Sequence, residues 1–158
     1  MAGAAADARG SAGRALGVDL GSVRIGLALS DPTRTIASPH SVLRRSHDHG
    51  ADHRAILQMA LEHEVTTIVV GLPLSLSGAK GPAARAAESE IGELQAAVGA
   101  GIEVVAHDER LTTISAERSL DEADVRGAER TAVVDKVAAA IMLQSWLESP
   151  RAPRAPAR

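Results

Sequence analysis

GVDLGSVRIGLALSD, residues 17–31, contains two apolar strand-like runs on either side of a short turn at Gly21-Ser22. A connection this short joins neighbouring antiparallel strands. A third strand-like run follows after a second turn, Asp31-Pro32. The chain therefore begins with a predicted antiparallel meander, whose strands are expected at residues 15–20, 24–30 and 36–43.

Helix and strand patterns alternate after this meander. Helices are expected at residues 51–63, 82–98 and 131–147, and buried strands at 66–70 and 102–106. Residues 111–130 are charged and only partly periodic, which predicts a helix followed by a loop near residues 121–127. Such alternation indicates parallel crossover units. The predicted fold is a mixed five-stranded α/β sheet, three antiparallel strands and then two parallel ones, with helices on both faces. This is the layout of a ribonuclease H-like domain.

Length and composition limit the domain organisation. Residues 1–13 and 149–158 are rich in small residues, proline or arginine and are expected to be flexible tails. The remaining residues, 14–148, are enough for one domain with a real core. That core must consist almost wholly of Ala, Val, Leu and Ile, because the chain has one tryptophan and neither Phe nor Tyr. Binding of nucleic acid by base stacking is thereby excluded, so any such contact should be to the phosphate backbone.

Charge and hydropathy indicate a cytoplasmic protein. The net charge of −3 argues against a generally basic protein that binds nucleic acid over its whole surface. No cysteine is present, which suits a reducing compartment. Apolar runs are far shorter than the roughly 20 residues of a membrane span, so no membrane contact is expected.

Acidic side chains stand at three places that the predicted fold would bring to one rim of the sheet. These are Asp19, the pair Asp108-Glu109, and Asp135. Carboxylates at such places cost folding energy unless a cation neutralises them, and a divalent metal is the simplest candidate. Adjacent residues of a strand face opposite ways, which favours Glu109 as the ligand and leaves Asp108 as the alternative.

The ligand chemistry predicts which ions would bind. Oxygen ligands suit Mg²⁺ or Mn²⁺ better than zinc. Two such ions about 4 Å apart, bridged by Asp19, could activate water and stabilise the leaving oxygen of a phosphodiester. Each acid also has a purely structural interpretation: a turn for Asp19, a helix cap for Asp108, and the favourable dipole of a helix start for Asp135.

Other residues near the expected rim are candidates for contacts with substrate. Lys80 and Arg110 could hold phosphates, although single basic residues near helix starts are also ordinary surface residues. Gly21 and Gly26 would let a phosphate or ligand approach the hairpin backbone closely. The loop GLPLSLSG, residues 71–78, could border the substrate or be a simple connection.

A histidine-rich segment, residues 47–53, suggests a zinc site at first sight. It has no second ligand pair to fix the geometry, so a solvated loop entering a helix is the preferred interpretation. Replacement of Asp52 by alanine is accordingly expected to have little effect.

Four motifs in this order resemble the YqgF/RuvX family: GVDLGSVRIGLALSD, GLPLSLSG, DERLTT and DKVAAAIMLQSWL. The resemblance runs from about Arg14 to Leu147. It implies a ribonuclease H-like fold and a nuclease linked to maturation of the 5′ end of pre-16S ribosomal RNA, and some members are described as Holliday junction resolvases. The family's acidic positions fall on Asp19, Asp108-Glu109 and Asp135. Val23 departs from the family, in which many members have lysine before the position of Arg24, so the phosphate contact expected of Arg24 is weaker at this turn.

Two other classes of function have to be weighed. Sugar kinases and actin-like ATPases also open with such a hairpin, but they need two domains around the nucleotide. A non-catalytic nucleic-acid-binding domain is the third possibility, and the presence of all the candidate acids favours an enzyme over it. The sequence does not indicate whether the substrate is RNA or branched DNA. A resolvase would be expected to act as a homodimer, whereas RNA processing could use a monomer.

Overall fold

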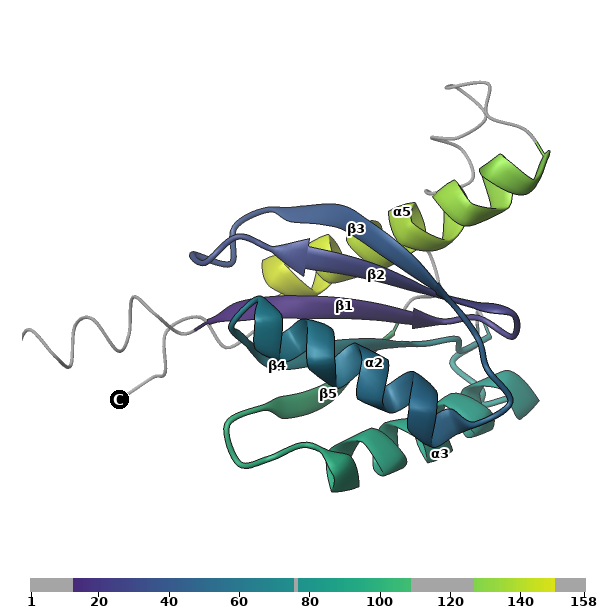
Figure 1. The fold of residues 1–158 in the computed structure, drawn as a ribbon. Coiled ribbons are helices and arrows are strands. Elements are labelled where there is room, and N and C mark those ends of the chain that lie inside the picture. Colours follow the sequence, from purple (N-terminus) through teal and green to yellow (C-terminus); the bar gives the residue numbers. More distant parts are fainter. Residues whose placement is uncertain (1–12, 76, 109–126, 150–158) are drawn as a thin grey trace, which may run out of the picture.

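The computed structural model describes residues 13–75, 77–108 and 127–149 of the chain (Figure 1). In chain order the described elements are β1 (Arg14–Leu20), β2 (Arg24–Ser30), β3 (Ala37–Arg44), α2 (His49–Glu62), β4 (Val65–Leu72), α3 (Pro82–Ala97), β5 (Glu103–Asp108) and α5 (Gly127–Glu148). Of the helix and loop expected at 111–130, residues 111–126 lie outside the described residues and 127–130 belong to α5. The expected tails also lie outside them, except for residues 13 and 149.

The five strands form one mixed sheet in the order β3-β2-β1-β4-β5. β1 pairs antiparallel with β2, and β2 with β3. β4 is parallel to both β1 and β5. The predicted meander followed by parallel strands is therefore confirmed, and the carboxyl ends of β1, β4 and β5 share one edge.

Local signals in the sequence set the starts of α2 and α3. The side chain of Asp48 caps α2 by accepting a hydrogen bond of 2.9 Å from the Gly50 N–H. Pro82 occupies the first turn of α3, where its missing N–H is harmless. The β-branched run of β4, VTTIVVGL, suits a buried strand.

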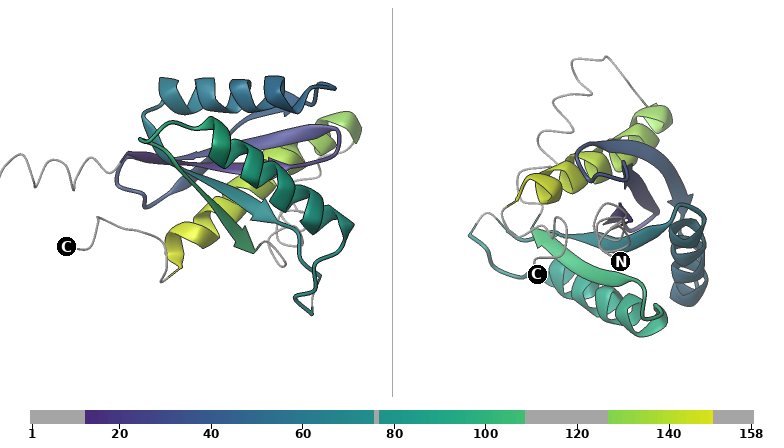
Figure 2. Two further views of the ribbon diagram at one scale, coloured as in Figure 1. Left: turned by 90° about the horizontal axis from the view of Figure 1, so that it is seen from below. Right: turned by 90° about the vertical axis from the view of Figure 1, so that its left-hand side faces the viewer.

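Helices cover both faces of the sheet, with α2 and α3 on one side and α5 on the other (Figures 1 and 2). The α2–α3 side encloses a core of large aliphatic side chains, which includes Leu16, Val18, Ile56, Ile68 and Leu94. The α5 side is built from smaller residues around Met142, Leu143 and Trp146. Within the described ranges, no helix combines the length and the apolar character needed to cross a membrane.

Two glycines let α5 lie almost directly on the sheet. A Cβ atom at Gly26 would be 2.0 Å from the backbone oxygen of Asp135, and one at Gly17 would be 2.8 Å from the Leu143 Cβ. Gly26 was expected to admit a phosphate or ligand, but the backbone of α5 occupies that space. The glycines of β1 and β2 therefore fix where α5, and with it Asp135, sits above the hairpin.

Replacement of Gly26 by alanine is expected to destabilise the protein by at least about 2 kcal/mol, because the added methyl group must displace the backbone of α5. Gly92→Ala is the matched control. Gly92 lies inside α3 with nothing within 4 Å of an added Cβ, and alanine there should stabilise by about 0.5–1 kcal/mol. Urea unfolding of the two variants tests this, and equal free energies of unfolding would contradict the close approach of α5.

Candidate functional site

Asp19 and Asp135 meet where β1 approaches its carboxyl end. Gly17 faces α5, so Asp19, two residues further along the same strand, faces it too. Asp19 pairs with Gly26 across the hairpin, and the backbone of Asp135 lies over Gly26. The predicted convergence of these two acids is thus seen in the structure.

Asp135 does not lie at a helix start, contrary to the expectation from the sequence. α5 begins at Gly127, eight residues earlier. The favourable effect of a helix N-terminus on an anion fades within the first turn. The helix dipole therefore cannot explain the carboxylate of Asp135, and a neighbouring cation has to stabilise it.

Arg24 supplies that cation from β2. Its Nε lies 3.0 Å from Oδ2 of Asp135, and the two side chains are 31% and 21% exposed. No cation pairs with Asp19 in the described part of the chain, and burial, and then the negative charge of Asp135, raise its pKa to about 6. The pair of carboxylates with one arginine carries excess negative charge, which suits a place where a cation binds.

The end of β5 lies at the same edge of the sheet. Val104 packs in the core on the α2–α3 side, so alternation along the strand directs Asp108 toward that side as well. His107 faces α5, and its Nε2 lies 3.1 Å from Oγ of Ser145. Asp108 thus starts from the sheet face opposite to that of Asp19. Glu109 and Arg110, the other candidates here, lie outside the described residues.

The chemistry of the donors fits a hard divalent ion. Asp19 and Asp135 offer only carboxylate oxygens, the ligands that Mg²⁺ and Mn²⁺ prefer. Among the described residues there is no group of three or more acids, histidines or cysteines arranged to hold a metal. A complete site on this edge would therefore need a further ligand in addition to these two acids.

Lys80 lies between β4 and α3. Its Nζ is 3.1 Å from Glu88 Oε1, and its side chain is 55% exposed. The preceding loop is closed by backbone hydrogen bonds, Gly78 N–H to Ser75 O at 2.8 Å and Ser75 N–H to Ala79 O at 3.1 Å. An exposed, singly paired lysine of this kind is compatible with a phosphate contact and with an ordinary surface role.

Arg45, which the sequence analysis did not single out, anchors the hairpin that carries Asp19 and Arg24. Its Nη1 and Nη2 donate to the two carboxylate oxygens of Glu90 at 2.5 and 2.9 Å. Its Nε donates to the Gly21 carbonyl at 2.9 Å, and its backbone N–H donates to Val23 O at 2.8 Å. The β1–β2 turn is thereby tied to α3 through one buried ion pair.

The histidine-rich segment takes part in this buried cluster. Asp52 Oδ2 lies 3.7 Å from Arg45 Nη1, and His53 Nε2 lies 2.9 Å from Glu90 Oε1. Both side chains are buried, so the expected solvated segment is wrong for these two residues. Helical spacing was the missed signal, because both residues precede the buried Ile56 by one turn.

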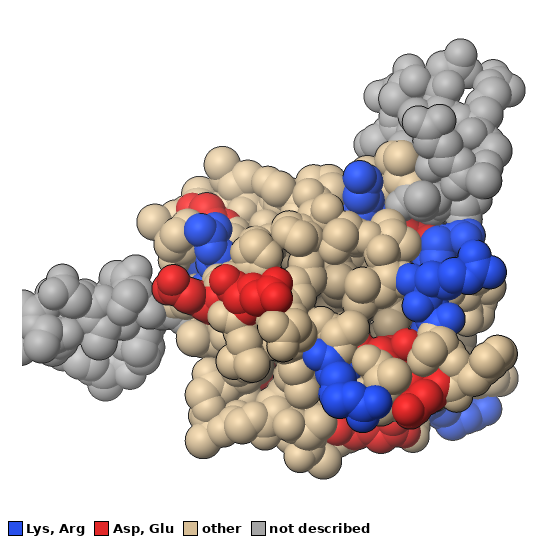
Figure 3. Space-filling model, in the orientation of Figure 1, with Lys and Arg blue, Asp and Glu red and all other residues tan. Residues whose placement is uncertain are grey.

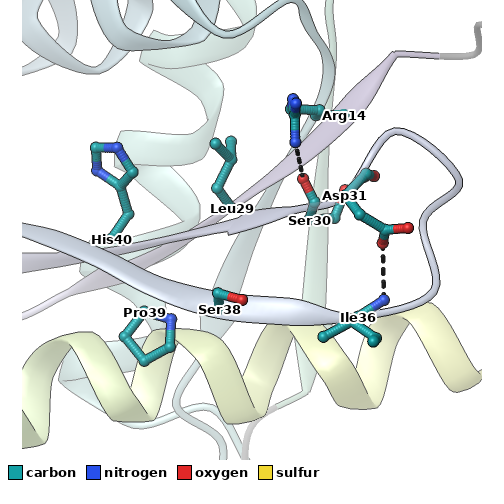
Figure 4. A pocket seen from close by; sticks show the side chains of 8 residues that line it. All are labelled: Arg14, Leu29, Ser30, Asp31, Ile36, Ser38, Pro39 and His40. Atoms are coloured by element: carbon teal, nitrogen blue, oxygen red, sulfur yellow. Dashed lines mark hydrogen bonds between the residues drawn. The ribbon is translucent and has the colours of Figure 1, made fainter.

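A separate cavity of about 340 Å³ lies at the far end of the hairpin, where β1 and β3 begin (Figure 4). Its polar groups are engaged within the chain: Arg14 Nη1 donates to Ser30 O at 3.1 Å, and Asp31 Oδ1 accepts from the Ile36 N–H at 2.8 Å. These contacts brace the β2–β3 connection. The cavity is therefore part of the scaffold, distant from the two acids.

The sequence and the fold both match known proteins. The model of one protein family, described as "RuvX: Holliday junction resolvase", matches residues 13–149. A relative from Mycobacterium sp. (strain KMS), named "Putative pre-16S rRNA nuclease", is 45% identical over 140 residues, which are 89% of this chain and 82% of the relative. A relative of the same name from Myxococcus xanthus (strain DK1622) is 43% identical over 140 residues, 89% of this chain and 91% of that protein.

A solved structure entitled "T. thermophilus RuvC in complex with Holliday junction substrate" has a similar fold. The TM-score is 0.51 at 14% sequence identity, with 85% of this chain and 96% of that chain covered. Together with the observed strand order and directions, this likeness identifies the fold as ribonuclease H-like.

Proposed function

The chain belongs to the RuvX family, and on that premise we propose that it is a nuclease that hydrolyses phosphodiester bonds at the edge where Asp19 and Asp135 meet. The observation that carries the proposal is the excess of negative charge there. Asp19 sits beside Asp135 with its pKa raised to about 6, and within the described residues Arg24 forms an ion pair with Asp135 alone. A divalent cation would relieve this imbalance.

The proposed ligands are Asp19, Asp135 and Glu109, with Asp108 as the alternative to Glu109. The proposed ions are Mg²⁺ or Mn²⁺, as a pair. When bound, they would supply an activated water and neutralise the charge that develops on the leaving oxygen.

The chain's own residues have distinct roles in this proposal. Asp19 is held by β1, a central strand paired on both sides, so its position is fixed before substrate arrives. Arg24 holds Asp135 in place and is close enough to the acids to contact a substrate phosphate. Lys80 and Arg110 are the other proposed phosphate contacts. Arg45 holds the turn between Asp19 and Arg24.

The proposed substrate is the 5′ region of pre-16S ribosomal RNA, contacted through its phosphate backbone, in the cytoplasm. The names of the relatives favour this substrate. The description of the family favours a second candidate, a four-way DNA junction cut by a homodimer. RNA processing would be possible for a monomer.

Cleavage of the two substrates side by side tests the proposal. A pre-16S 5′ leader RNA and a synthetic four-way DNA junction are incubated with Mg²⁺ or Mn²⁺ and wild-type protein or Asp19→Asn. We expect cutting of the RNA by wild type only. Glu62→Gln, which removes one charge from an exposed position at the end of α2, is the matched control and should cut normally. Cutting of the junction alone would make the protein a resolvase, and cutting of neither would contradict a nuclease that acts without partners.

A further inference from the structure

Two arginines lie directly opposite each other beside the acidic edge. Arg24 on β2 and Arg44 on β3 are paired residues of the antiparallel register. Like charges in that position repel and destabilise a sheet. Arg24 is balanced by Asp135, whereas Arg44 is exposed and pairs with no carboxylate in the part of the chain that the structure describes.

Both guanidinium groups belong to the sheet face that carries the acids. Arg24 reaches Asp135 on α5, and a directly opposed residue on the neighbouring strand points to the same face. Asp19, Arg24 and Arg44 therefore follow one another across β1, β2 and β3. Lys and Arg side chains gather at this end of the molecule, where the β1–β2 turn lies (Figure 3).

An exposed arginine without a carboxylate partner is well suited to bind a phosphodiester. Its planar fork donates two parallel hydrogen bonds to phosphate oxygens. Arg54 on α2, by contrast, is 73% exposed, and its Nη2 lies 3.7 Å from Oδ2 of Asp48. Arg44 therefore brings to the surface beside the acids a positive charge that no carboxylate of the described residues balances.

We propose that Arg44 and Arg24 form a phosphate-binding pair, over which one strand of the nucleic acid passes as it leaves the acidic edge across β2 and β3. This inference rests on the proposed nuclease function and adds the route of the substrate backbone. A phosphate between the two guanidinium groups would remove their repulsion. The route would keep the substrate on the α5 side of the sheet, away from α2 and α3.

Binding measured without cleavage tests the proposal. Each variant is made in the Asp19→Asn background and titrated against fluorescent pre-16S leader RNA and four-way junction DNA at several salt concentrations. Arg44→Gln should raise the Kd for the bound probe about 5- to 10-fold and reduce the salt slope by about 1. Arg54→Gln makes the same charge change on the opposite helix layer and should change Kd less than about 2-fold.

Wild-type cleavage distinguishes failure of this inference from failure of the proposed function. With Asp19 restored, Arg44→Gln should raise KM and leave kcat at its wild-type value. Equal effects of Arg44→Gln and Arg54→Gln in a protein that cleaves would overturn the phosphate pair alone. Binding without cleavage by wild type, with the expected loss in Arg44→Gln, would support the pair and overturn the nuclease. Absence of wild-type binding to both probes would overturn both.

Discussion

Replacement of Asp19 by asparagine is expected to lower metal-dependent cleavage at least about 1,000-fold while the protein stays folded. Asparagine keeps the size of the side chain but loses the charge that would hold a divalent ion. Charge stabilisation by such an ion is worth several kcal/mol, and each 1.36 kcal/mol is a factor of ten in rate. Single-turnover cleavage at saturating protein measures the effect, and a rate within about 10-fold of wild type would contradict the assigned role.

The same variant is expected to be more stable than wild type at neutral pH without metal. Burial, and then Asp135, raise the pKa of Asp19 to about 6 from an ordinary value of 3.8. A raised pKa means that the folded state binds the proton more tightly than the unfolded state. The associated stability is fully present below pH 3.8 and is lost as the pH rises through 6. The loss is on the order of 3 kcal/mol for a shift of this size.

Chemical unfolding of both proteins in EDTA from pH 4 to pH 8 measures this difference. Titrating groups distant from Asp19 contribute almost equally to wild type and Asp19→Asn and cancel in the comparison. The free-energy difference should grow in favour of the variant between pH 4 and pH 6.5 and then level off. A difference that stays constant with pH would show that Asp19 titrates normally.

Replacement of Arg45 by alanine should cost about 3–5 kcal/mol of stability, the usual effect of removing one partner from a buried ion pair. Glu90 and Asp52 are almost fully buried and would lose their shared cation. The β1–β2 turn would lose the hydrogen bond at Gly21. Total stabilities of such domains are about 5–15 kcal/mol, so urea unfolding would show a large shift.

Arg54→Ala is the matched control for Arg45→Ala. Arg54 is exposed, and its loss should cost no more than about 0.5 kcal/mol. At acidic pH, the difference in free energy of unfolding between wild type and Arg45→Ala should become smaller. Burial raises the pKa of Glu90, but hydrogen bonds from Arg45 and His53 outweigh burial, so its pKa is lowered from 4.5. Stability from that pairing is present above pH 4.5 and is lost as the pH falls. Equal costs for the two arginines would contradict the buried cluster.

Short-range patterns were sufficient to predict the sheet. The turns at Gly21-Ser22 and Asp31-Pro32 left room only for antiparallel neighbours, and the following strand–helix alternation required parallel crossovers. The position of Asp19 near the carboxyl end of β1 followed from the same reasoning. The start of α5 was placed at residue 131 instead of 127, because the apolar period becomes clear only there.

Contacts between distant segments were the part that sequence could not supply. The Arg45–Glu90 pair joins residues 45 positions apart, and neither local spacing nor composition specifies it. Gly26 was expected to leave space for a ligand, because no local pattern indicates that the backbone at Asp135, 109 residues later, fills this space. Asp135 was expected near the start of its helix because the apolar period of α5 becomes clear only at residue 131.

Manganese binding in the absence of nucleic acid is the direct test of a metal site at Asp19. Wild type and Asp19→Asn are titrated with Mn²⁺ by calorimetry at pH 7.5, where Asp19 is ionised. We expect wild type to bind Mn²⁺ and Asp19→Asn to bind it at least about 10-fold more weakly, as loss of a ligand oxygen should cause. Equal Mn²⁺ affinity in the two proteins would contradict a metal site at Asp19.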